Sequence, residues 1–246
     1  MYEKKALLHD INRELSLDII GIDNYKIGQP SLIVANHSCM KDIFAVPSAL
    51  PEASQIVLSA RMMWKCNTPE NKLRRMTIEN SLYGIPLEVH GGQERLNIGI
   101  EMAKRALIDG WSVIIFPEGA YTKDYQVNKG RTGATQILFE ARQKGVNANL
   151  IPVGIDNRSD IDNLDDFIPH NDSMIINIGA PINYDGHYYD YINANSIEKR
   201  RIALHAPVDI AMRSIAKTIG RPYLDEYIEL RKRDTIILEN GDEILL

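Results

Sequence analysis

Three short apolar runs in the chain have the pattern of strands that are buried on both faces. They are SLIVA (31–35), WSVIIF (111–116) and LIPVGI (150–155), and turn residues follow or precede each of them. Continuous apolar runs of this length are typical of the central strands of parallel sheets, where both faces are covered. A further strand is indicated at 17–22, ahead of the first run. The pattern predicts a sheet with a buried centre.

Segments with apolar residues at helical spacing separate these runs. A helix is predicted at 1–16, another at 96–107, ended by Asp109–Gly110, and a third at 132–144. Strands that alternate with helices are typical of βαβ units. We therefore expect an α/β fold with a mostly parallel central sheet flanked by helices.

The length and the even composition of the chain indicate one domain. Its 246 residues are enough for a single large α/β domain, and no repeat, low-complexity tract or Gly/Ser linker divides them. The domain is expected to span 1–246. Near its end, Asn240–Gly241 lies between short apolar runs, which predicts a terminal hairpin at 234–246.

Charge and cysteine content narrow the classes of function. The 28 Lys and Arg residues against 33 Asp and Glu give a net charge of -5, which argues against a nucleic-acid partner. Cys39 and Cys66 form neither a disulfide framework nor a zinc motif, so we expect a cytoplasmic protein without a metal site. The chain shows no signal peptide and no run of 18 apolar residues, so it is expected not to span a membrane.

Two of the buried strands end in residues with catalytic chemistry. Asn36 and His37 follow the first apolar run, and Glu118 and Gly119 follow the second. Sites in open α/β sheets form just beyond the carboxyl ends of the strands. We therefore expect these side chains to meet at one edge of the sheet.

The spacing between His37 and Asp42 has two interpretations. Inside a regular helix, residues five apart point roughly 140° away from each other, so the two side chains can meet only if His37 precedes the first turn. Asp42 could then accept the Nδ1 proton and leave Nε2 as a base, which is the logic of an orienting acid in a triad. The alternative is a structural histidine near a helix cap.

Other polar groups have a functional and a structural interpretation as well. Cys39 could be a nucleophile that carries an acyl group, although a free cysteine is commonly a small buried hydrophobe. Lys129 and Arg131 lie among glycines at the start of a predicted helix, where a phosphate could bind, but the spacing is not that of a P-loop. EKRR (198–201) is interpreted as a solvated charge run.

Taken together, the motifs resemble those of the lysophospholipid acyltransferase superfamily, the glycerolphosphate and 1-acylglycerol-3-phosphate acyltransferases. Residues 36–42 match its NHxxxxD motif, and 116–119 match its FPEG block. Residues 84–90 fall where the family has a Gly…Arg block, and 151–153 resemble its fourth block. Order and spacing agree over roughly 17–185.

The resemblance implies a glycerolphosphate-acyltransferase-like fold and acyl transfer to an acceptor hydroxyl in phospholipid biosynthesis. The donor would be an acyl thioester on coenzyme A or acyl carrier protein, and no cofactor or metal is implied. His37 would be the general base and Asp42 its orienting residue, while Asn36, Glu118 and Gly119 would lie in the substrate site. The implied location is cytoplasmic, at the inner face of the membrane as a peripheral protein.

Two positions depart from the pattern of the family. The Gly…Arg block ends in His90, and Tyr121 stands where the FPEG block usually continues to an arginine. Arg95, Lys129 or Arg131 could supply the missing cations at a phosphate. The departures favour an acceptor without a terminal phosphate, such as a hydroxyl or amine of a specialised lipid or secondary metabolite.

Two further hypotheses stay open. One is a lipid-binding homologue that no longer catalyses a reaction. The presence of His37, Asp42 and Glu118 argues against it. The other is a thioesterase or lipase that uses the same base on water, although the chain has no GxSxG elbow.

Overall fold

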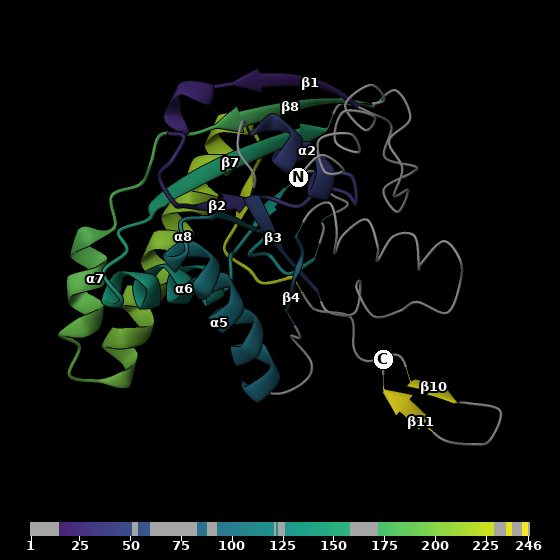
Figure 1. The fold of residues 1–246 in the computed structure, drawn as a ribbon. Helices are drawn as coiled ribbons and strands as arrows, with labels where there is room; N and C mark the ends of the chain where they lie inside the picture. Colours follow the sequence, from purple (N-terminus) through teal and green to yellow (C-terminus); the bar gives the residue numbers. More distant parts are fainter. Residues whose placement is uncertain are drawn as a thin grey trace.

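A seven-stranded mixed sheet forms the centre of the molecule (Figure 1). The computed structural model describes residues 15–50, 54–59, 83–87, 93–120, 122, 126–157, 172–228, 235–237 and 243–245. The strands lie in the order β1-β8-β7-β2-β5-β3-β4. Their bounds are β1 Leu15–Ile20, β2 Ser31–Ala35, β3 Ser54–Ser59, β4 Ile85–Leu87, β5 Ser112–Ile115, β7 Asn149–Asn157 and β8 Asp172–Ile178.

Most strands of the sheet run in one direction. Parallel pairing joins β7, β2, β5, β3 and β4 in turn, whereas β8 is antiparallel to β7 and carries β1 parallel to itself. The expected mostly parallel sheet is confirmed, with an antiparallel step towards one edge. Because β2 and β5 are parallel neighbours, their carboxyl ends lie side by side.

Helices cover both faces of the sheet (Figure 1). One face is covered by α2, and the other by α5, α6 and α8, while α7 packs on α8. The helices are α2 Asp42–Ala49, α5 Gln93–Ile108, α6 Gly133–Gln143, α7 Asp185–Ile192 and α8 Ile197–Ile219, with a short 3-10 helix, η1, at Ile22–Asn24.

The burial of β2 explains its uninterrupted apolar sequence. Ile33 and Ala35 belong to the hydrophobic cluster that includes α2. Leu32 and Val34 belong to the cluster on the opposite face, with α5, α6 and α8. Alternate side chains of a strand point to opposite faces, so a strand covered on both sides is apolar at successive positions, here from Leu32 to Ala35.

The N-terminal strand begins earlier than the sequence predicts. The structure places β1 two residues before the expected strand at 17–22. Leu15 and Ser16, which the pattern assigned to the end of an N-terminal helix, instead pair with β8. Leu15 is buried in the sheet, and a single apolar residue at a boundary fits either periodicity. The rest of the predicted helix, 1–14, lies outside the described residues.

Two small sheets complete the architecture. β6 (Val127–Asn128) pairs in parallel with β9 (Tyr223–Leu224). β10 (Thr235–Ile237) pairs antiparallel with β11 (Glu243–Leu245), inside the segment where a terminal hairpin is expected. The β6–β9 pairing joins the chain that follows the FPEG block to the chain that follows α8.

α8 has well-defined ends. The Ser196 hydroxyl accepts a hydrogen bond from the Lys199 backbone N–H at 3.2 Å, and Gly220 ends the helix in the left-handed conformation with φ of 67°. Within the described part of the chain, no helix, α8 included, is both long enough and apolar enough to cross a lipid bilayer.

Candidate active site

A loop between β2 and α2 holds His37 against Asp42. β2 ends at Ala35 and α2 begins at Asp42, so His37 precedes the first turn of the helix. The His37 Nδ1 and Asp42 Oδ2 atoms are 2.9 Å apart. The Asp42 side chain is fully buried, and the His37 ring is one-tenth exposed. The pair has the geometry that the five-residue spacing requires for contact.

Asp42 also organises the loop. Its Oδ2 accepts hydrogen bonds from the backbone N–H groups of Ser38 at 2.6 Å and Cys39 at 2.9 Å, and the Ser38 hydroxyl donates to Oδ1 at 3.2 Å. Because Asp42 Oδ2 is an acceptor, His37 Nδ1 is the donor in the contact between them. The other ring nitrogen, Nε2, is then unprotonated and carries the lone pair. The same carboxylate therefore fixes the loop and orients the imidazole.

The carboxyl end of β5 brings Glu118 to the same loop. Glu118 Oε1 accepts a hydrogen bond from the His37 backbone N–H at 3.3 Å, and Oε2 accepts one from the Asn128 side-chain amide at 3.5 Å. Glu118 is fully buried, and this burial raises the pKa of its carboxyl group to about 8. The Glu118 carboxyl group is therefore mostly protonated near pH 7.

Two other contacts hold His37 in place. Its ring stacks on Phe116, with the ring centroids 4.4 Å apart and the planes inclined by 22°. Its carbonyl oxygen accepts a hydrogen bond from the Thr122 backbone N–H at 3.0 Å. The chain turns between Phe116 and Thr122 at Gly119, whose φ of 82° favours glycine. The FPEG block therefore supplies both a ring contact and a tight turn.

Asn36 joins the end of β2 to β7. Its side-chain oxygen accepts a hydrogen bond from the Ile155 backbone N–H at 2.7 Å, and its amide group donates to the Ile155 carbonyl at 3.0 Å. These two bonds extend the β2–β7 pairing by one residue through a side chain. We infer that Asn36, a predicted substrate-binding residue, acts by fixing the start of the His37 loop.

Cys39 is placed against Asp42 and is almost completely buried. Burial, and after it the nearby Asp42 charge, raise the pKa of the Cys39 thiol well above its usual range. A thiolate is the form that attacks a thioester, so a raised pKa works against a nucleophilic role. Asn157 lies within 3.5 Å of the Cys39 sulfur, which packs the thiol between two polar side chains.

Residues 16–156, more than half of the chain, match the family model described as Acyltransferase. The chain belongs to the Acyltransferase family. Its fold is similar to the crystal structure of the 1-acyl-sn-glycerophosphate (LPA) acyltransferase PlsC from Thermotoga maritima, with a TM-score of 0.54 and 17% sequence identity over 86% of this chain and 80% of that chain. No curated protein sequence matches the chain. The family and the fold class expected from the residues are confirmed.

In this member of the Acyltransferase family, two candidate phosphate-binding residues contact the segment after β9. The Lys129 ammonium group pairs with Asp225 Oδ1 at 2.6 Å. The Arg131 guanidinium group donates to the Ile228 carbonyl at 2.9 Å and lies 5.3 Å from the centroid of the Tyr227 ring. Arg131 therefore holds this segment, while Lys129 keeps part of its surface exposed.

The other predicted phosphate contacts are His90, Tyr121 and Arg95. His90 and Tyr121 lie outside the described residues. Arg95 lies on α5, and its side chain is not among those that the structure describes.

Sequence reasoning missed the residues that support His37, Asp42 and Glu118. Ser38 bonds to Asp42, Asn128 bonds to Glu118, and Thr122 bonds to the His37 backbone. A polar residue inside a buried segment, as Asn128 is in β6, was the available signal, because a buried amide needs a partner. Which partner it finds depends on contacts between elements.

Proposed function

We propose that this protein transfers an acyl group from an acyl thioester to an acceptor hydroxyl, with His37 as the general base and Asp42 as its orienting residue. The observation that carries the proposal is the 2.9 Å contact between His37 Nδ1 and Asp42 Oδ2. A base held in one tautomer and one orientation removes a proton efficiently in the transition state.

The proposed reaction balances without a further reactant. The acceptor oxygen attacks the thioester carbonyl carbon as His37 Nε2 takes the hydroxyl proton. The tetrahedral intermediate collapses, the C–S bond breaks, and the proton passes from His37 to the leaving sulfur. The products are an ester and a free thiol, and His37 returns to its starting form.

Glu118 is proposed to shape the site as a neutral group. Its carboxyl group accepts hydrogen bonds from the His37 backbone and from Asn128, and a protonated carboxyl group can also donate one. These contacts support a positioning role for Glu118 at His37. A contact between Glu118 and the acceptor, which the family resemblance implies, is compatible with its place beside the base.

The proposed substrates follow from the family. Acyl-coenzyme A or acyl carrier protein would be the donor, a lipid or lipid-like molecule the acceptor, and no resident cofactor is needed, because a thioester reacts without metal activation. PlsC, whose fold is similar, is an LPA acyltransferase, which supports a lipid acceptor. We propose a cytoplasmic protein that works at the membrane surface.

The acceptor is proposed to lack a terminal phosphate. His90 and Tyr121 stand at the two positions where the family resemblance places arginines. A phosphomonoester carries close to two negative charges near neutral pH, and burying them without cations is costly. A hydroxyl or amine on a lipid without such a phosphate avoids this cost.

Measuring free thiol release with and without an acceptor tests the proposed reaction. Release that depends on the acceptor supports acyl transfer, and release that does not need it indicates a thioesterase. No release with any donor indicates a lipid-binding protein. The His37→Ala variant is the reference for background hydrolysis, and its rate should fall about 10²–10⁴-fold.

A further inference from the structure

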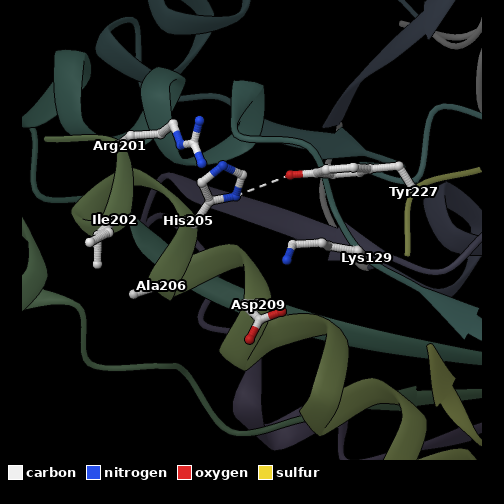
Figure 2. Close-up of a pocket in the computed structure, with 7 residues that line it drawn as sticks. All are labelled: Lys129, Arg201, Ile202, His205, Ala206, Asp209 and Tyr227. Atoms are coloured by element: carbon white, nitrogen blue, oxygen red, sulfur yellow. Dashed lines mark hydrogen bonds between the residues drawn. The ribbon is translucent and has the colours of Figure 1, made fainter. Parts of the chain in front are cut away.

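A depression of about 490 Å³ lies between α8 and the segment that follows β6. Its volume is in the range of small-molecule sites. Residues at intervals of three to four along α8 form one of its walls, and the segments after β6 and β9 form the other (Figure 2). It is lined by Lys129, Arg201, Ile202, His205, Ala206, Asp209 and Tyr227. None of these residues belongs to the set that contacts His37.

Two cationic side chains and a histidine line this pocket, together with Asp209. Figure 2 shows the Lys129 ammonium group and the His205 ring facing the same space, with the Arg201 guanidinium group beside the ring. Burial, and then the charges of Lys129 and Arg201, lower the pKa of His205. Arg201 has no ion pair or side-chain hydrogen bond within the part of the chain that the structure describes. Among the described residues, Arg201 is therefore a cation of the pocket without an ion-pair partner.

Two acidic side chains near the pocket, Asp209 and Asp225, already have cationic or hydroxyl partners. Asp209 accepts a hydrogen bond from Arg213 at 2.9 Å and another from the Tyr223 hydroxyl. Asp225 pairs with Lys129 and lies 3.6 Å from Arg213. Because Asp209 and Asp225 already bind other groups, the Arg201 guanidinium group is, among the described residues of the pocket, the cation open to an anionic ligand.

Apolar and aromatic surface lies beside the cations. Ile202 is 61% exposed and Tyr227 is 43% exposed, so both present apolar surface to a ligand in the pocket. The Tyr227 hydroxyl is 3.3 Å from His205 Nδ1, so its ring is held at the pocket wall. A ligand that matches this lining has an anionic group and an apolar or aromatic body.

We propose that this pocket binds a phosphate ester, with the phosphate between Lys129 and Arg201 and the body of the ester against Ile202 and Tyr227. Two substrates of the proposed reaction can carry such a group: the coenzyme A donor and a phosphorylated lipid acceptor. The choice between them rests on the proposed function, whereas the binding itself does not. Because the acceptor is proposed to lack a terminal phosphate, coenzyme A is the expected ligand.

Binding is measured on the full chain carrying His37→Ala, so that turnover does not interfere. The ring resonances of labelled His205, assigned with a His205→Gln variant, are followed during separate titrations with coenzyme A, lysophosphatidic acid and inorganic phosphate. Coenzyme A should give a saturable shift and raise the pKa of His205, because a bound phosphate stabilises the imidazolium form. The affinity should fall as salt is added.

Variants of α8 distinguish binding in this pocket from a general effect of surface charge. Arg201→Ala should weaken coenzyme A binding about tenfold, since it removes one charge-assisted contact. Arg201→Lys should recover part of this loss. The matched control is Lys199→Ala, which removes the same charge from the same helix outside the pocket and should change the affinity less than about twofold.

Each outcome decides the proposal. A response to lysophosphatidic acid in place of coenzyme A supports the pocket and assigns it to the acceptor. The proposal is overturned if neither ester shifts His205, if inorganic phosphate binds as well as both esters, or if Arg201→Ala and Lys199→Ala weaken binding equally. Intact coenzyme A binding in a protein that releases no thiol would overturn the proposed function and leave the pocket supported.

Discussion

At Asp42, one carboxylate accepts hydrogen bonds from two backbone N–H groups and from the His37 ring. The backbone bonds fix the loop, and the ring contact fixes the imidazole. Asparagine can separate these roles, because its side-chain oxygen can still accept from Ser38 and Cys39 while the negative charge that faces the imidazole is gone.

We expect Asp42→Asn to lower turnover by about 10²–10⁴-fold while the affinity for the acyl donor changes little, because Asp42 orients the base and does not bind substrate. Steady-state kinetics with a saturating acceptor measure both quantities. Asp185→Asn, at the start of α7, is the control for losing a carboxylate at a helix start. Unchanged turnover in Asp42→Asn would leave Asp42 as a cap alone.

Cys39→Ala should keep most of the activity. The thiol is buried, its pKa is raised, and a small apolar side chain can take its place beside Asp42. Initial rates of the variant and the wild type, compared at equal folded concentration, provide the test. Complete loss of activity with an intact fold would instead revive an acyl-enzyme that forms on Cys39.

Glu118 should make stability depend on pH in an unusual direction. Its folded pKa of about 8 lies above the ordinary value of 4.5, so the folded state binds more protons than the unfolded state between these values. The free energy of unfolding should therefore fall as pH rises through this window, by at most about 1.4 kcal/mol per pH unit from this one group. Below pH 4.5 its contribution is constant.

Denaturant unfolding of the wild type and Glu118→Gln between pH 5 and 9 tests this dependence. The glutamine variant keeps a neutral hydrogen-bonding group, so its stability should fall less steeply with pH. Parallel curves for the two proteins would mean that Glu118 does not titrate in this range.

Among the elements, the segment after β6 packs closely on α8. A Cβ atom added at Gly130 would lie 2.6 Å from Val208 Cγ2 and 3.2 Å from Pro117 Cβ. Glycine therefore allows the approach between this segment, α8 and the FPEG turn. Gly133, at the start of α6, has nothing within 4 Å of the same position.

Gly130→Ala should lower the free energy of unfolding by about 1–3 kcal/mol, because it overpacks the contact with Val208. Gly133→Ala should be neutral or stabilise by up to about 1 kcal/mol. Chemical denaturation with a constant m-value measures both. Adding Val208→Ala to Gly130→Ala should recover part of the loss, and no recovery would contradict the proposed clash.

The elements that the sequence predicts best are those with a strong local pattern. β2, β5, β7, α5 and α6 follow from uninterrupted apolar runs or clear helical spacing. The charged residues at 198–201 hid the pattern of α8; they are exposed, as their interpretation as a solvated run predicts, and Arg201 also lines the pocket. Leu15 fits a helix or a strand, and its pairing with β8 decided between them.

For the whole molecule, acceptor choice should follow the balance of charge at the site. We expect poor use of lysophosphatidic acid relative to an acceptor without a terminal phosphate, by about 10²–10⁴-fold if two charge-assisted contacts are missing. Introducing His90→Arg with Tyr121→Arg should recover part of this activity. His90→Gln with Tyr121→Phe, which adds no cation, is the control.

Comparing kcat/KM for the two kinds of acceptor measures this preference. Efficient acylation of lysophosphatidic acid by the unchanged protein would contradict the prediction. It would also direct attention to Arg95, Lys129 or Arg131 as the source of the missing charge.

Much of the candidate site was predictable because of one rule of architecture. His37 and Glu118 are far apart in the sequence, but both follow buried strands, and parallel neighbours bring their carboxyl ends together. The rest was not predictable because it depends on tertiary contacts. Asn128 reaches Glu118 only because β6 lies beside the FPEG turn.

The sheet topology has a consequence for the order of folding. β1 pairs with β8, which comes more than half the chain later. β6 also pairs with a strand that comes much later in the chain, β9. Contacts between residues that are far apart in the sequence form slowly, because the entropy cost of closing the loop between them comes before the contact is made. On the ribosome, β1 therefore stays without its native neighbour until β8 has emerged. The nascent chain exposes an unpaired strand edge during this interval, and a chaperone that covers such edges should raise the yield of native protein.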